Sequence, residues 1–352
     1  MKRSTTLSSP SGVAGDYSLF LDAFRLLTLA QYSLHFDYDL RLAANTREDA
    51  ERFCALSNAL YSRKVTPAYY RWQFFDTPFS SRLAFLVSGN ELVGCYGFQL
   101  RPAVTGCSIA WAIDIMIARD YQGQGLFRPL ANYAEAKVQE FRPAALCVMA
   151  NDRSVKPHVL GLGWELVKTI YTYELDLSAH APPPSPIHGS SFDRLAAQRA
   201  AELAAKCPTQ HWQTIRSGDF LEWRYASNPR YSYRLVTSTS PATSRAAVVT
   251  KLFHDPVLNT NIGDLVDVFL EPYAVAEVES ALQAGIAELA ASGATVVQTW
   301  LETNTAFDRI AARLGFRQTS QVRHFCRKHM STDPAVMPAT DWFLTMSDSE
   351  VY

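Results

Sequence analysis

The chain has 352 residues, of which 48% are hydrophobic and 19% charged, and its formal net charge is -1. This composition indicates a globular protein long enough for two domains. The near-zero charge gives no reason to expect nucleic acid or an anionic membrane as partner. The six cysteines are scattered, without a C-x-x-C pair or metal-ligand spacing, so we expect a reduced, cytoplasmic protein that holds no metal.

Residues 1–36 are predicted to form a tail followed by one helix. Met1–Gly15 is rich in Ser, Thr, Gly and Pro, whereas Leu19–Ala30 is amphipathic. The apolar segment around this helix is too short and too interrupted by charge to span a membrane. We expect the helix to pack on the body of the protein or on another subunit, which would make a homodimer. Association with a membrane surface is the alternative.

Residues 37–180 are predicted to form one domain of strands and helices. Asp49 follows Thr46 at the spacing of a capped helix start, and Gly89-Asn90 marks a hairpin turn. Strands are expected at residues 39–44, 83–87, 93–100, 107–118, 145–150 and 169–177, and helices at 46–60, 126–141 and 154–160.

One stretch of this domain has the pattern of an anion site. The apolar run Ile113–Ala118 leads through a short break into Gln122-Gly123-Gln124-Gly125 and then directly into a helical pattern. Glycines let the backbone approach phosphate oxygens, and the N–H groups and dipole of the helix start favour negative charge there. The alternative is an ordinary strand-to-helix turn without a ligand.

Four prolines within residues 181–186 cannot sustain a helix or strand, so residues 181–190 are predicted to be a linker. After the linker, features of the first domain return in the same order. Three pairs of landmarks share an offset of 151 to 153 residues: Trp72 and Trp223, Asn151 and Asn304, and Gly163 and Gly315. This offset predicts a duplicated domain at residues 191–330, followed by a tail at 331–352.

The second copy lacks the glycine turn. Its equivalent region, Val266–Val275, contains no glycine and has Glu271 at the turn, which disfavours a polyphosphate. We therefore predict one anionic cofactor site per chain, in the first copy. The second copy would support the fold and wall the substrate cleft.

The order strand, Gln-x-x-Gly turn, helix, strand, Asn and Gly-aromatic resembles the GNAT acyltransferases. Gln122–Gly125 is similar to the Q/R-x-x-G-x-G/A signature of that superfamily, which holds the pyrophosphate of acyl-coenzyme A. The resemblance implies an α/β (α+β) fold with two GNAT-like domains, each a mixed, largely antiparallel twisted sheet flanked by helices. It also implies acetyl-CoA or a short-chain acyl-CoA as co-substrate.

The resemblance assigns the cofactor contacts residue by residue. The strand before the turn would pair with the pantetheine arm, the turn and helix start would bind the pyrophosphate, and the N-x-x-A/S position would line the pantetheine. These residues are Ile115, Met116 and Ile117, then Gln122, Gly123, Gln124, Gly125, Leu126 and Phe127, and finally Asn151 and Ser154.

Two departures from the family pattern bear on the chemistry. Phe127 stands where the signature ends in Gly or Ala, and Gly-Leu-Phe is similar to the Gly-Ile-Phe of tandem GNATs in bacterial sugar and surface-polysaccharide pathways. His158 stands where the family often has a tyrosine as general acid, and the extra residue before Gly163-Trp164 leaves that alignment open.

The C-terminal segment Asp341–Glu350 resembles the W-x-x-T-x-G-D-x-D ending of tandem GNATs that acylate amino sugars. Ser347 replaces the Gly and Glu350 the last Asp of that pattern. The resemblance implies that the tail docks near the acceptor, with Trp342 and Glu350 as substrate-binding residues.

Acyl transfer to an amine requires a base for the amine proton, and four residues are candidates: Asp114, His158, Asp348 and Glu350. Asp114 lies in an apolar strand beside the expected thioester, where burial would raise its pKa; alternatively it bonds a neighbouring strand. His158 could be an ordinary helix histidine. Asp348 could contact the acceptor or act as the base, or both Asp348 and Glu350 could belong to a solvated tail.

The repeated aromatic-basic segments contain Arg71 and Trp72 in the first copy and Arg224 in the second. Core packing, with each Arg paired to a carboxylate, is the favoured interpretation. In the alternative, these residues bind substrate, and an Arg holds a sugar-nucleotide phosphate by bidentate hydrogen bonds.

The sequence therefore predicts an N-acyltransferase that moves an acyl group from acyl-CoA to an amine by direct transfer in a cleft between two GNAT domains. The preferred acceptor is an amino sugar carried on a nucleotide. The alternatives are acetylation of a small amine or peptide, and a CoA-binding sensor or scaffold without turnover.

Overall fold

The computed structural model describes residues 38–62, 64–104, 106–180, 187–206, 213–240, 243–270, 275–301, 306–330 and 342–349. The chain from Asp39 onward forms one compact unit. The predicted N-terminal helix, Glu350 and most of the predicted linker lie outside the described residues. In the described part of the chain, no helix is long and apolar enough to cross a membrane.

The first half alternates strands with helices as predicted, and adds one helix at the aromatic segment before residue 76. Thr46 caps the first described helix by accepting the N–H of Asp49 at 3.2 Å, as the sequence indicates. The elements are β1 (Tyr38–Leu42), α2 (Arg47–Leu60), α3 (Pro67–Phe74), β2 (Ser81–Ser88), β3 (Glu91–Pro102), β4 (Ser108–Ile117), η1 (Arg119–Tyr121), α4 (Phe127–Gln139), β5 (Ala145–Ala150), α5 (Asp152–Lys156), the π-turn η2 (Pro157–Gly161) and β6 (Glu165–Asp176).

The second half repeats this order. Its elements are β7 (His188–Ser191), α6 (Arg194–Lys206), α7 (Gly218–Leu221), the π-turn η3 (Glu222–Ala226), β8 (Tyr233–Thr237), β9 (Ala246–Asp255), β10 (Thr260–Leu270), α8 (Val275–Ala291), β11 (Val296–Leu301), α9 (Ala306–Arg313), β12 (Arg317–His329) and η4 (Met346–Asp348). The short α3 and α7 are equivalent, and each begins after a hydroxyl residue, Thr66 or Ser217.

The described strands form one sheet in the order β1-β2-β3-β4-β5-β12-β6-β11-β10-β9-β8-β7. β4 and β5 pair in parallel in the first half, and β10 and β11 pair in parallel in the second. The other ladders of defined register are antiparallel. The prediction of mixed, largely antiparallel sheets flanked by helices is therefore confirmed.

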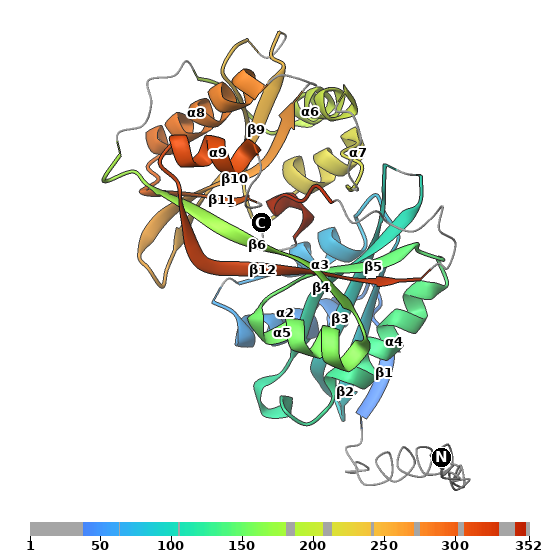
Figure 1. Cartoon of the computed structure of the whole chain (residues 1–352). Helices are drawn as coiled ribbons and strands as arrows, with labels where there is room; N and C mark the ends of the chain where they lie inside the picture. Colours follow the sequence, from blue (N-terminus) through green and yellow to red (C-terminus); the bar gives the residue numbers. More distant parts are fainter. Residues whose placement is uncertain are drawn as a thin grey trace, which may run out of the picture. The chain divides into compact units, whose positions relative to one another are not determined.

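The last strand of each half crosses into the other half. β12 pairs with β5, β6 pairs with β11, and the two long strands pair with each other between them. Figure 1 shows β6 and β12 running side by side through the centre of the molecule. The two halves of the sequence thus complete each other's sheet.

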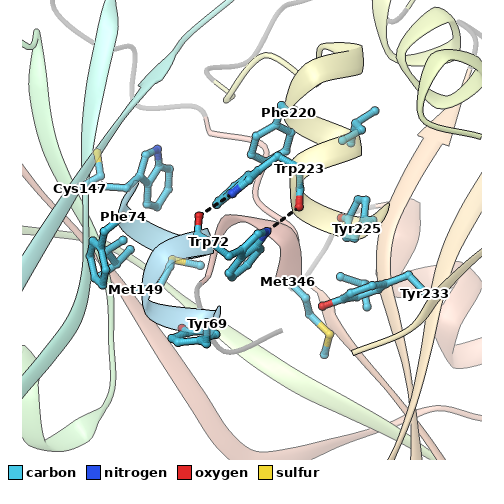
Figure 2. Packing of buried hydrophobic residues seen from close by; sticks show 14 of the residues in the cluster. Tyr69, Trp72, Phe74, Cys147, Met149, Phe220, Trp223, Tyr225, Tyr233 and Met346 are labelled. Carbon is cyan, nitrogen blue, oxygen red and sulfur yellow. Dashed lines mark hydrogen bonds between the residues drawn. The ribbon is translucent and has the colours of Figure 1, made fainter. Parts of the chain in front are cut away.

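The repeated tryptophans meet in the core between the halves. The rings of Trp72 and Trp223 stack with their centroids 4.8 Å apart, and each side chain is 4% exposed. The indole of Trp72 donates to the carbonyl of Trp223 at 2.8 Å, and the indole of Trp223 donates to the carbonyl of Trp72 at 2.9 Å (Figure 2). This exchange satisfies both buried N–H groups, so core packing accounts for the repeated landmark.

Candidate active site

β4 separates from β5 beside the predicted cofactor residues. The parallel ladder runs from Ile109 opposite Ala145 to Ala112 opposite Val148, and no described pairing joins the two strands beyond it. Residues 113–117 therefore keep one side of their backbone outside the β4–β5 ladder. An extended ligand could hydrogen-bond there, as predicted for Ile115–Ile117.

A β-bulge lies at the same place in β4. Gly97 of β3 faces Ile113, and Cys95 faces Met116, so two residues of β4 stand opposite the single residue Tyr96. Bulges of this kind redirect a side chain and are frequent beside active sites.

Asp114 occupies the bulge with φ at 47°, a conformation that costs free energy in a residue other than glycine. Its carboxylate is partly exposed and accepts a long hydrogen bond from the hydroxyl of Tyr69 on α3, at 3.4 Å. The thiol of Cys95 donates to the backbone carbonyl of Asp114 at 3.1 Å. The strand thus presents the predicted base in a strained backbone conformation next to the splayed strands.

The glycine turn joins this splayed strand to α4. Gly123 and Gly125 have φ of 75° and 77°, and no atom lies within 4 Å of where a Cβ would stand on either. The side-chain amides of Gln122 and Gln124 brace the turn by donating to the carbonyls of Ile117 (2.8 Å) and Asp120 (2.7 Å).

This turn fits a polyphosphate. The turn leads directly into α4, which begins at Phe127, and the space at both glycines is open, so backbone N–H groups and the helix dipole are available to an anion. Leu126 is buried beneath the turn and anchors it to the core. The residues that the sequence assigned to pyrophosphate are therefore contiguous in the turn and the start of α4, and their role in binding stays a prediction.

Asn151 and Ser154 form a capping box at the start of α5. Asn151 Oδ1 accepts the N–H groups of Arg153 and Ser154, each at 3.0 Å, and Ser154 Oγ accepts the N–H of Asn151 at 3.1 Å. The side chains of both residues therefore fix the helix start that follows β5.

His158 lies in the π-turn η2, which accommodates the extra residue before Gly163. The ring is buried, with Nδ1 2.7 Å from the carbonyl of Ser154 and Nε2 2.9 Å from the hydroxyl of Tyr96. Because a carbonyl only accepts, Nδ1 carries the proton and Nε2 accepts from Tyr96. Burial lowers the pKa of His158 to about 4, against the opposing effect of the Ser154 carbonyl, so the ring is neutral at pH 7.

The second half contains an equivalent aspartate in a different setting. Aligning β10 with β4 pairs Asp267 with Asp114, but the register of β10 against β9 shifts at Val266, so Asp267 itself stands opposite Val249. Asp267 is 1% exposed and accepts from Arg216 at 3.1 Å, from Tyr225 at 3.1 Å and from Thr345 at 2.9 Å.

The C-terminal segment packs beside Asp267 and Arg216. Asp348 is buried, and both its carboxylate oxygens accept from Arg216, at 3.1 and 2.9 Å. Burial opposes the charge of Arg216, but Asp348 and Asp267 raise its pKa above the ordinary value. Asp348 thus ties the tail to the second half, and among the described contacts none joins it to Asp114.

The other predicted substrate residues also have partners away from Asp114. Trp342 is buried against Phe325, with ring centroids 4.8 Å apart. Arg224 is fully buried and donates to the carbonyl of Ser349. Arg71 is exposed beside Asp76 at 3.4 Å and lines a groove of about 690 Å³ between the two repeats.

Sequence reasoning missed Arg230 as a candidate. It lies in the segment before β8, and its guanidinium carbon is 5.7 Å from the ring centre of Tyr69. The only available signal was a difference between the copies, since the residue after the repeated proline is Phe79 in the first copy and Arg230 in the second.

The chain was compared with known proteins. A sequence model described as the Acetyltransferase (GNAT) family matches residues 46–171. No curated protein matches the chain significantly.

Three solved structures resemble its fold. A tandem GNAT protein from the clavulanic acid biosynthesis pathway is 13% identical, with a TM-score of 0.61 over 84% of this chain and 99% of the other. N-myristoyltransferase of Saccharomyces cerevisiae, with bound myristoyl-CoA, is 10% identical, with a TM-score of 0.62 over 83% and 79%. A glucosamine N-acetyltransferase region of a fungal GH3 β-N-acetylglucosaminidase is 11% identical, with a TM-score of 0.60 over 83% and 38%.

The family match covers the strand, the glycine turn and the helices that build the site, and the structural likenesses extend over both halves. Residues 46–171 therefore form a GNAT acetyltransferase domain, and the chain that carries it is a CoA-dependent N-acyltransferase with the fold of tandem GNAT proteins.

Proposed function

We propose that this enzyme acylates the amine of a small acceptor bound beside Asp114, and that the acceptor is an amino sugar, carried on a nucleotide. The observation that supports this site is the contrast between the two equivalent aspartates. Asp267 is enclosed by Arg216, Tyr225 and the tail, whereas Asp114 is partly exposed at the splayed strands. Of these two equivalent aspartates, Asp114 is the one whose carboxylate a ligand could reach.

The first copy also carries the cofactor site. Gln122–Phe127 would hold the pyrophosphate, and Ile115–Ile117 with Asn151 and Ser154 would border the pantetheine. When bound, acyl-CoA supplies an activated thioester. The protein contributes position and a proton acceptor: Asp114 takes the amine proton, and the Tyr69 hydroxyl holds the carboxylate in place.

Two observations support an amino sugar. The tail sequence resembles the ending of tandem GNATs that acylate amino sugars, and one structural neighbour is a glucosamine N-acetyltransferase region. The alternative acceptors remain a small amine or a peptide. A CoA-binding scaffold is the alternative outside catalysis.

Asp114→Asn tests the base. We expect kcat to fall about 10²–10⁴-fold with an unchanged Kd for CoA, because the amide cannot take the proton while the cofactor loop is intact. Asp39→Asn, an exposed aspartate on β1, is the control. Release of CoA thiol from acetyl-CoA with glucosamine, UDP-glucosamine, small amines and a peptide gives the rates. Wild-type kcat in Asp114→Asn would remove Asp114 from the mechanism, and CoA binding without turnover of any amine would support the scaffold.

Gly125→Trp tests the cofactor loop. A side chain there enters open space, so the fold should survive, with about 1–2 kcal/mol of strain from the positive φ. The indole would fill the cradle, so we expect CoA binding by calorimetry to weaken at least a hundredfold. Gly89→Trp, at the β2–β3 hairpin with φ of 57° and equally open surroundings, should bind CoA like the wild type. Equal CoA affinity in the two variants would exclude this loop as the cofactor site.

A further inference from the structure

Arg230 of the second half reaches the side of the site formed by the first. Its guanidinium carbon is 5.7 Å from the ring centre of Tyr69 and 5.1 Å from that of Tyr231. The side chain is half-buried, and among the described residues it forms these ring contacts and no ion pair. A cation placed on aromatic faces without a carboxylate partner remains able to bind an anion.

The backbone holds Arg230 in this position. Asn228 Oδ1 accepts the N–H groups of Arg230 at 2.9 Å and Tyr231 at 3.2 Å, and Asn228 Nδ2 donates to the carbonyl of Arg224 at 3.3 Å. An Asx turn of this kind fixes the segment before β8. The backbone at Arg230 therefore has a defined conformation, which fixes the position from which the side chain extends.

Tyr69 connects Arg230 to the proposed base. Its ring face contacts the guanidinium, and its hydroxyl points to the carboxylate of Asp114 at 3.4 Å. Opposite charges thus stand at two sides of one tyrosine ring, supplied by the two halves of the chain. A small molecule that carries both an amine and an anionic group could engage both charges at once.

We propose that Arg230 binds an anionic group of the acceptor, so the substrate is an amine that also carries a phosphate or a carboxylate. This rests on the proposed function, which places the acceptor amine at Asp114. Arg230 gives the second half a direct part in substrate selection, whereas the sequence suggested Arg71 or Arg224 for this role. The equivalent residue of the first half, Phe79, cannot bind an anion.

Steady-state kinetics of Arg230→Met test the proposal with four acceptors: glucosamine, glucosamine 6-phosphate, UDP-glucosamine and glutamate. Loss of a charged hydrogen bond should raise KM for the preferred anionic acceptor at least tenfold, leave KM for glucosamine unchanged and alter kcat little. The preferred acceptor of the wild type distinguishes phosphate from carboxylate. Arg194→Met, an exposed arginine 3.7 Å from Glu222, is the matched control.

Binding without turnover supplies a second readout. N-acetylglucosamine 6-phosphate, titrated calorimetrically into the full chain without CoA, should bind the wild type and Arg194→Met. We expect its Kd for Arg230→Met to be at least tenfold higher than for the wild type. Its Kd for Arg230→Lys should lie between these two values. Thermal melting checks that each variant is folded.

The two proposals can fail separately. Acylation of amines with the same KM for charged and neutral acceptors, or the same KM in Arg230→Met and the wild type, would overturn the role of Arg230 alone. Arginine-dependent binding of the phosphate ligand, without acylation of any amine, would support Arg230 as an anion site and count against the proposed function.

Discussion

Asp114 and Asp267 are the same residue of a duplicated domain, and their neighbours give them different roles. Arg216 neutralises Asp267, and the position equivalent to Arg216 in the first half is Val65. A valine cannot supply the ion pair that Arg216 makes with Asp267, and the carboxylate of Asp114 accepts from the hydroxyl of Tyr69. This substitution between the copies accompanies the difference between Asp114, the proposed base, and Asp267, which is enclosed in the fold.

His158 should make the protein sensitive to acid. The ordinary pKa of 6.5 in the unfolded chain falls to about 4 in the folded protein because the ring is buried. Between these pH values the unfolded state binds more protons, so this group costs stability as the pH falls from 6.5 to 4, by roughly 3 kcal/mol in total. His158→Gln can still accept from Tyr96 but does not titrate, so its stability should change less over this range.

Urea unfolding of wild type and His158→Gln at pH 4, 5, 6 and 7 measures this difference. His324→Gln, which removes the histidine bonded to Asp152 at the surface, should retain the wild-type pH profile. Parallel profiles for wild type and His158→Gln would mean that the buried ring does not control the acid response.

At the scale of elements, the C-terminal segment behaves as part of the core. Thr345 and Asp348 form a capping box around η4, and Trp342, Leu344 and Met346 are buried between the halves. Arg101 of β3 donates to the carbonyl of Asp348 at 3.3 Å, so the segment contacts both halves. Removing it would expose core side chains, so loss of activity in a truncated chain would report unfolding as well as an altered site.

Asp348→Asn should destabilise the protein more than any surface substitution. Asp267 still balances the charge of Arg216 in this variant, but the amide breaks the second buried ion pair and can turn an N–H donor toward the guanidinium donors; breaking a buried pair costs about 3–5 kcal/mol. Asp76→Asn breaks an exposed pair with Arg71 and should change stability by less than about 1 kcal/mol. Urea midpoints at pH 7 compare the two variants. A similar midpoint for both would contradict the structural role of Asp348.

The whole molecule is held together by exchange of strands. β5 is buried along its length and obtains β12 as neighbour from the second half, while β6 leaves the first half to pair with β11. A first half expressed alone would present an apolar, unpaired strand edge, which favours aggregation. The shared sheet thus makes the two halves one folding unit.

Separate expression of residues 37–180 and 187–352 tests this interdependence. Each fragment alone should aggregate or stay unfolded, whereas co-expression should give a soluble pair that binds CoA, because the exchanged strands restore both sheets. Size-exclusion chromatography and calorimetry with CoA measure assembly and binding. A soluble, monomeric first fragment with wild-type CoA affinity would show that β12 is dispensable for that half.

The sequence by itself determined the features that depend on local pattern. The glycine turn between a strand and a helix, the cap at Thr46 and the repeated landmarks around Trp72 follow from backbone conformation, hydrogen bonding and spacing along the chain. These signals led to the proposed cofactor loop and to the duplicated fold. Asp114 was also found this way, because a carboxylate in an apolar strand is unusual.

Tertiary structure decided what depends on partners distant in sequence. Arg216 and Asp348 lie 132 positions apart, and Trp72 and Trp223 lie 151 apart, so no local pattern indicates that they meet. Tertiary contacts also decide the exchange of strands, because nothing in the sequence of β6 or β12 indicates with which half of the chain it pairs. The sequence therefore names the proposed cofactor loop and the candidate base, while long-range packing decides which aspartate is enclosed and brings Arg230 next to Tyr69.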